Sequence, residues 1–310
     1  CRRSCLATLI LVFALLAARP GLAAEGATSF YLLGLHGPLA AVAPPPGVYF
    51  QNDAYIYSGR VNRTETLPFL GRVTAGARAD VYLDLPTLLW QTPWQVAGGQ
   101  IGITVTQPVG VERVVGRVIG GGYELVEQGT RTSYGDLAVA LPINWSFDRL
   151  HLSVTPSVNI PSGNYNSRAL SNVALHRWAG DLSLATTWLD TTTGLEASAI
   201  AGLTLNGRNF ATNYRTGTEV HAEVAVSQYF SKAFSVGVIG GYLQQITADA
   251  GLGDSLGDFK GRVFAAGGMA SYAMPIASRD VLMRAKVLQE FNVQNRLSGT
   301  AGILSIGFQF

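Results

Sequence analysis

Charged and polar side chains recur at every second position in two stretches of the chain, as they would on one face of a strand. The candidate residues are His221, Glu223, Arg284, Lys286, Glu290 and Asn292. If these strands surround a lumen, the charges would line it and set its ion preference. The alternative, which we favour, is a solvated ladder of cross-strand pairs that stabilises the barrel interior.

Few motifs in the chain point to catalysis. The four histidines are His36, His151, His176 and His221, and no Gly-x-Ser-x-Gly motif lies near any of them. No His or Cys cluster has the spacing of metal ligands. The glycine pairs and triplets lack the Lys-Ser or Lys-Thr that completes a phosphate-binding loop. We therefore expect the protein not to be an enzyme and to need no cofactor or metal.

The elements that would position the candidate residues are strands of alternating character. Apolar and polar residues alternate from Asp136 to Phe147 and from Leu150 to Ile160, around a tight turn at Asp148-Arg149, which predicts a hairpin. Similar stretches begin near Val48, Ala77, Gln100, Val118, Trp178, Leu195, Thr218, Phe234, Arg262, Val281 and Gly299. The pattern predicts an all-β, antiparallel transmembrane barrel of about 12 strands, with about 10 or 14 as alternatives.

Residues 1–24 have the pattern of a secretory signal peptide. Arg2 and Arg3 precede an apolar run from Leu6 to Ala18, and small residues follow Pro20. A membrane-anchoring helix is the alternative, but the run is shorter than the roughly 20 residues that a span needs. Both cysteines lie in this signal, so the exported chain has no disulfide. Of 22 Lys and Arg residues, three belong to the signal, which leaves 19 against 20 acidic residues and no electrostatic case for nucleic acid.

The last residues of the chain favour the outer membrane of a Gram-negative envelope. Leu304, Ile306, Phe308 and Phe310 share one side, as in a barrel-closing strand with a lipid-facing surface and an interfacial ring. Only 14% of residues are charged and 48% are apolar. Because strands cross a membrane only in closed barrels, we expect residues 46–310 to form one. A soluble lipocalin-like barrel, with its apolar side chains inside, is the alternative.

Several motifs also resemble a known family. They are Pro44-Pro45-Pro46-Gly47-Val48-Tyr49, Tyr134-Gly135-Asp136, the stretch from Asn209 to Gly217, Gly241-Tyr242-Leu243-Gln244-Gln245 with Asp249, and Asn295-Arg296. In order and spacing they resemble the outer-membrane proteins grouped as involved in the meta-pathway of phenol degradation, over nearly all of the chain after the signal. The resemblance implies a porin-like transporter barrel, distantly similar to the long-chain fatty acid channel. It implies no particular solute, since the family label reflects genetic context.

The segment between signal and barrel, residues 25–45, is unusually apolar. From Phe30 to Ala43 its composition does not suit a free periplasmic tail. Three interpretations fit this stretch: a plug folded into the lumen, an irregular first strand, and a disordered lead.

Two functions remain compatible with the sequence. The first is an outer-membrane channel for uptake of small hydrophobic or aromatic compounds, which cross lipopolysaccharide and water-filled porins poorly. The second is a structural or surface-interaction barrel that binds a partner through its loops. The longest expected loops are moderate, which favours transport, and lie around Arg60 to Thr74, Pro161 to His176, Gly207 to Thr216 and Ala248 to Gly261. The expected partners are outer-membrane lipid and lipopolysaccharide, the barrel assembly machinery through the C-terminal strand, and the solute.

Overall fold

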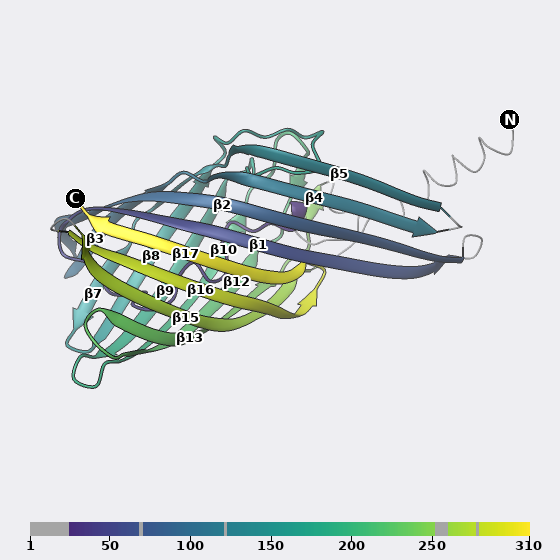
Figure 1. Cartoon of the computed structure of the whole chain (residues 1–310). Helices are drawn as coiled ribbons and strands as arrows, with labels where there is room; N and C mark the ends of the chain where they lie inside the picture. The colour runs from purple at the N-terminus through teal and green to yellow at the C-terminus, as the bar shows by residue number, and fades with distance from the viewer. Residues whose placement is uncertain (1–24, 68–70, 121–122, 252–259, 277–278) are drawn as a thin grey trace, which may run out of the picture.

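The computed structural model describes residues 25–67, 71–120, 123–251, 260–276 and 279–310 (Figure 1). The expected signal peptide at 1–24 lies outside these residues. After a single 3-10 turn, η1 (Glu25–Ala27), the assigned elements are strands: β1 (Gly47–Leu67), β2 (Gly71–Val96), β3 (Gly99–Thr106), β4 (Val109–Gly120), β5 (Tyr123–Tyr134), β6 (Leu137–Ala140), β7 (Ile143–Phe147), β8 (Leu150–Ile160), β9 (Ala179–Asp190), β10 (Leu195–Asn206), β11 (Tyr214–Arg215), β12 (Glu219–Tyr229), β13 (Phe234–Gln245), β14 (Ala250–Gly251), β15 (Arg262–Ile276), β16 (Arg279–Gln294) and β17 (Ser298–Gln309). The described residues contain no helix with the length and hydropathy to cross a membrane.

The strands close into a ring. Neighbouring strands pair antiparallel, and β1 pairs with β17 to complete the circle. β3 with β4 makes one barrel strand, and β5, β6 and β7 make the next, with interruptions at Pro108 and Pro142, where proline has no N–H to donate. In the part of the chain that the structure describes, this gives a closed barrel of 12 antiparallel strands. The expected fold class is confirmed.

Four strands extend beyond the rest of the barrel at one end, as Figure 1 shows for β1, β2, β4 and β5. β1 pairs with β17 only as far as Arg60, yet it pairs with β2 as far as Leu67. Beyond β4, β5 has no further strand neighbour among the described residues. The expected loop from Arg60 to Thr74 is therefore wrong where the structure describes it, because strand pairing continues through most of that range.

The connections differ in length at the two ends of the barrel. One end carries short turns, such as 97–98 and 148–149, whereas the other carries the longer connections 161–178 and 207–218. Outer-membrane barrels place short turns in the periplasm and long loops at the cell surface. The extension formed by β1, β2, β4 and β5 therefore lies on the cell-surface side.

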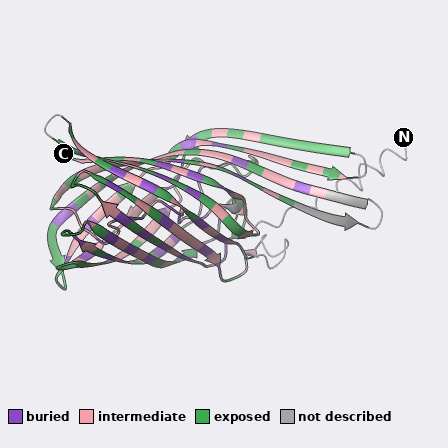
Figure 2. Cartoon of the chain, turned by 60° about the horizontal axis from the view of Figure 1, so that its bottom comes forward, coloured by how far each residue is buried: buried purple, intermediate pink, exposed green. Residues whose placement is uncertain are grey.

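The two faces of the barrel wall differ in polarity. Buried and exposed residues alternate along the strands of the barrel (Figure 2). On β12, Val224 and Val226 are exposed on the outside, while Glu223 and Ser227 are buried on the inside. The same alternation exposes Leu304 and Ile306 on the outside of β17. A soluble barrel would reverse this order, so the lipocalin-like alternative is wrong.

Aromatic rings gather near the short-turn end. The rings of Trp90 and Trp94 lie 5.1 Å apart, and Phe308 packs against both Phe50 and Phe310. The guanidinium of Arg279 lies 5.7 Å from the ring centre of Phe308. Amphipathic rings with a nearby cation are typical of the boundary between lipid and water. This arrangement indicates the periplasmic edge of the lipid-facing band.

Candidate functional site in the barrel lumen

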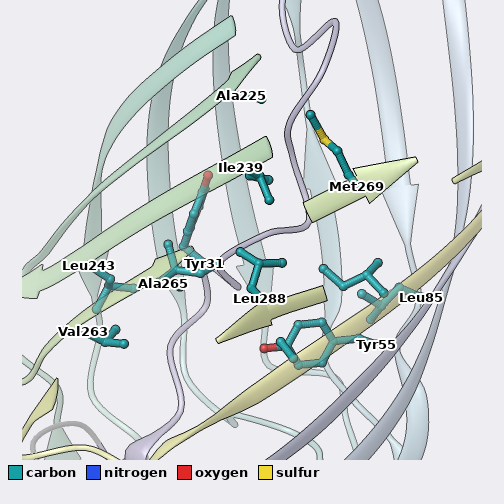
Figure 3. Packing of buried hydrophobic residues seen from close by; sticks show 13 residues of the cluster. Tyr31, Tyr55, Leu85, Ala225, Ile239, Leu243, Val263, Ala265, Met269 and Leu288 are labelled. Atoms are coloured by element: carbon teal, nitrogen blue, oxygen red, sulfur yellow. The ribbon is translucent and has the colours of Figure 1, made fainter. Parts of the chain in front are cut away.

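Residues 25–45, the N-terminal segment, run through the inside of the barrel (Figure 3). Tyr31 and Leu33 are buried in a cluster with the inward-facing side chains of Leu243, Leu288 and Ile303. Burying one large apolar side chain contributes about 1.5–3 kcal/mol. The apolar character of the segment is therefore satisfied by packing against the barrel wall.

Lys286 on β16 holds the backbone of this segment. Its Nζ donates hydrogen bonds to the carbonyl oxygens of Gly34, Leu35 and His36 at 2.6, 2.8 and 2.6 Å. The side chain is only 1% exposed. The three N–H donors of the ammonium are thus matched by three carbonyl acceptors, which compensates the cost of burying the charge.

Glu223 on β12, which is separated from β16 by β13 and β15, binds the same turn of the segment. Its Oε1 accepts hydrogen bonds from the Tyr31 hydroxyl and the Gly34 amide, each at 2.9 Å. The ring of His221 stacks on Tyr31 with centroids 3.4 Å apart, and its Nε2 lies 2.8 Å from Oδ2 of Asp181. Sequence reasoning placed His221 and Glu223 on one face, and the structure brings both to the N-terminal segment together with Lys286.

Gly34 lies at the centre of these contacts. Its φ of +89° is a conformation that residues with a side chain rarely adopt. A Cβ at this position would stand 2.8 Å from Cδ1 of Leu288. Both the backbone conformation and the close approach therefore require glycine.

Further along, the N-terminal segment is held by polar side chains of other strands. The Leu39 amide donates to Oε1 of Glu196 at 3.0 Å, and the Ala41 amide donates to the Thr187 hydroxyl at 3.1 Å. The carbonyl of Ala41 accepts a hydrogen bond from Asn144 at 3.2 Å. Backbone groups buried without a β-ladder thus find side-chain partners.

The remaining candidate residues have different surroundings. Glu290 accepts hydrogen bonds from the Tyr57 hydroxyl and the Gly299 amide, both at 2.8 Å. Arg284 lies beside Ser271 in the register of β15 and β16, on the same wall as Lys286. Asn292 is exposed and has a φ of +49°, next to a register shift that interrupts the alternation of β16. Of the six candidates, the structure therefore brings His221, Glu223 and Lys286 together at the N-terminal segment, and Asn292 lies outside this group.

Sequence reasoning missed several residues that hold the N-terminal segment. Glu219 accepts a hydrogen bond from Ser29 and forms an ion pair with Arg296 at 3.3 Å. Arg177, just before β9, donates to the carbonyl of Thr28 at 3.1 Å and is 1% exposed. The only sequence signal for the strand residues is their place on the polar face, and that pattern does not reveal which of them meet the N-terminal segment.

A cavity of about 850 Å³ lies on the cell-surface side of this packing. We call it the surface cavity; its wall includes Glu112 and Val114 of β4, Leu125 of β5, Leu170 and Leu175 of the connection 161–178, and Glu25 of the N-terminal segment. Most of these residues are apolar, and the volume of the cavity is in the range of sites that bind small molecules. The surface cavity reaches the beginning of the N-terminal segment, where Gly26 and Thr28 also line it.

Two groups of the 161–178 connection lie where this cavity meets the lumen. Burial raises the pKa of the Tyr165 hydroxyl to about 12, with a further contribution from Glu25, to which it donates at 3.3 Å. Burial lowers the pKa of the Arg177 guanidinium, and the negative charges of Glu219 and Glu25 oppose that change. At neutral pH Tyr165 is thus a neutral hydrogen-bond donor at the wall of the surface cavity.

Residues 60–306 match the protein family described as "Putative MetA-pathway of phenol degradation". The chain belongs to this family. The resemblance seen in the sequence is confirmed, and the match covers most of the barrel of this MetA-pathway family member. Comparison with curated proteins gives no match.

Solved structures support the fold of this MetA-pathway family member. The COG4313 outer membrane channel from Pseudomonas putida F1 is similar with a TM-score of 0.62 and 15% identity, covering 90% of this chain and 100% of that one. A Pseudomonas aeruginosa FadL homologue (TM-score 0.39, 10% identity, 88% and 92% covered) and the CymD monoaromatic hydrocarbon channel (TM-score 0.38, 8% identity, 86% and 89% covered) are less similar. A closed barrel with exposed apolar side chains on its outer face is the form in which strands cross the outer membrane, and this protein lies there.

Proposed function

We propose that this protein is an outer-membrane channel for the uptake of small hydrophobic or aromatic compounds. The observation that carries the proposal is the largely apolar surface cavity, which lies on the cell-surface side and reaches the start of the N-terminal segment. A water-filled porin would need no such cavity, whereas a molecule leaving the lipopolysaccharide layer needs an apolar surface on its way inward. The membership in a phenol-degradation family and the similarity to an outer membrane channel are consistent with this role.

The N-terminal segment is, in this proposal, a plug. Its contacts with Lys286, Glu223 and Glu196 are hydrogen bonds that can break without disturbing the β-ladders of the wall. A solute can then pass only when the segment moves aside. Small ions do not cross the barrel while the segment is in place. A link to phenol catabolism would follow if the solute were an aromatic substrate.

Deleting residues 25–43 tests the plug. The shortened protein should show a higher conductance for small ions in planar bilayers than the intact protein. Equal conductance of both, with the barrel shown to be folded, would count against the plug.

A surface-interaction role is the second candidate, and the extension favours it. Tyr123 and Val126 of β5 are 64% and 57% exposed beyond the ring, where a partner could reach them. A variant with a shortened extension separates the two roles. Uptake should be lost if the surface cavity serves transport, and uptake should persist if the extension only binds a partner.

The outer face of the barrel suggests the remaining partners. The exposed apolar side chains meet outer-membrane lipid, and we propose that lipopolysaccharide contacts the cell-surface extension. The closing strand, ending in the exposed ring of Phe310, is proposed to bind the barrel assembly machinery. The candidate site would bind and guide a solute without a catalytic step.

A further inference from the structure

Among the described residues, one carboxylate of the surface cavity forms no hydrogen bond to the N-terminal segment. Glu112 lies on the inner face of β4 and is 9% exposed. Its Oε2 accepts a hydrogen bond from the backbone amide of Asn172 at 2.8 Å, and the residue lines the cavity. The described residues provide no hydrogen bond to its Oε1.

The cations near this carboxylate are engaged elsewhere. Arg131, which faces Glu112 across the β4–β5 pair, directs its Nη2 to Oδ1 of Asn164 at 2.7 Å. Of the arginines that line the surface cavity, Arg117 pairs with Glu124 at 2.7 Å and Arg177 approaches Glu25 at 3.9 Å.

The third arginine that lines the surface cavity, Arg78, pairs with Asp80 at 3.0 Å. Within the described ranges, Glu112 is therefore a nearly buried acid without an ion pair, and it borders an apolar space.

A carboxylate has room for about four hydrogen bonds, and an unmatched one next to an apolar space is costly. A ligand that fills this space with apolar atoms alone would leave Oε1 without a donor. A ligand whose O–H or N–H group points at Oε1 would donate the missing hydrogen bond. Sites with a buried polar group discriminate strongly against analogues that lack its partner.

We propose that Glu112 makes the surface cavity selective for apolar molecules that carry one hydrogen-bond donor, a hydroxyl or an ammonium group. The donor binds Oε1 of Glu112, and the apolar body packs against Val114 and Leu170. This inference rests on the proposed uptake function and narrows its substrate class. It excludes plain hydrocarbons as the preferred solutes.

The test is equilibrium binding to the full barrel in lipid nanodiscs, with empty nanodiscs to subtract partition into lipid. The probes are naphthalene, 1-naphthol and 1-naphthylmethylammonium, which share one apolar body and differ in the donor. The unaltered protein should bind at least one of the two donors about ten-fold more tightly than naphthalene. Glu112→Leu should abolish that preference while naphthalene binding persists.

The Glu112→Gln variant separates the two donors. Its amide oxygen still accepts a hydrogen bond from a hydroxyl, so naphthol preference should largely survive, whereas preference for the ammonium should be lost with the charge. The control is Asp280→Asn, which also replaces a carboxylate by an amide but at an exposed position on β16. It should leave the binding of all three probes unchanged.

Failure of this inference and failure of the proposed function give different results. Equal binding of all three probes, or an undiminished donor preference in Glu112→Leu, would overturn the role of Glu112 but leave uptake intact. Binding of no probe above the empty nanodiscs, together with uptake that does not depend on the protein, would overturn both.

Discussion

Replacing Lys286 by methionine should release the N-terminal segment without unfolding the barrel. The ammonium donates to three consecutive backbone carbonyls, those of Gly34, Leu35 and His36, and methionine keeps the length of the side chain but supplies no donor. The side chain belongs to the inner face of β16, so the β-ladder hydrogen bonds to β15 and β17 remain.

The size of the effect follows from the number of bonds. A hydrogen bond to a charged group contributes about 1.5–3 kcal/mol, and water that enters the lumen would replace part of the three. We therefore expect a net loss of about 3 kcal/mol from the closed arrangement. That loss raises the ratio of released to docked segment by roughly a hundred-fold.

Single-channel recording in planar bilayers measures this ratio as the fraction of time in a conducting state. Lys286→Met should conduct far more often than the unaltered protein, and Lys232→Met, at an exposed lysine in the 230–233 turn, should not. If Lys286→Met gives the same record as the unaltered protein, this ammonium does not hold the segment in the lumen.

Three further predictions concern the segment, the C-terminus and the surface cavity. Gly34→Val should loosen the segment because its Cβ meets Leu288 at 2.8 Å, and faster amide hydrogen exchange at residues 29–41 would show it; unchanged exchange would refute the close packing. Phe310→Ala should lower the amount of folded barrel in the outer membrane several-fold, measured on immunoblots of membrane fractions, and an unchanged amount would argue against an assembly signal. The pKa of the Tyr165 hydroxyl is about 12 in the folded protein and about 10 in the unfolded chain. The contribution of this neutral hydroxyl to stability is therefore complete below pH 10 and is lost as the pH rises toward 12. Tyr165→Phe should therefore lose less stability than the unaltered protein between these pH values in thermal unfolding scans, and equal losses would contradict the burial of this hydroxyl.

The fold class could be predicted from the sequence because alternation is a local property. The pattern around Leu304 and Phe308 directly reflects which side of the strand meets lipid. The strand starts expected near Val48, Leu195 and Phe234 lie within about one residue of the first residues of β1, β10 and β13. The extension could not be predicted in this way. The residues from Arg60 to Thr74 are polar and rich in loop formers, since strands beyond the lipid need no apolar face.

The candidate site could be predicted only in part, because its partners are distant in the chain. Alternation selects Glu223 and Lys286 as inward-facing, but nothing local shows that both bind the backbone around Gly34. The pattern places Asn292 on the same face only if the alternation continues through the register shift near Phe264 and Phe291, and the sequence does not reveal that shift.

The burial of Arg177 depends on the N-terminal segment occupying the lumen, and the 161–178 connection in which it lies reads as an ordinary loop.

The most direct test of the uptake function is uptake by cells in which the gene is deleted and then restored. The panel is labelled phenol, toluene, a naphthalene derivative and a long-chain fatty acid, each supplied at limiting concentration. If the protein is an uptake channel, at least one of these compounds should enter at a rate that depends on the gene. Equal rates for every compound, with the protein present in the outer membrane, would contradict the uptake function and favour a surface-interaction role.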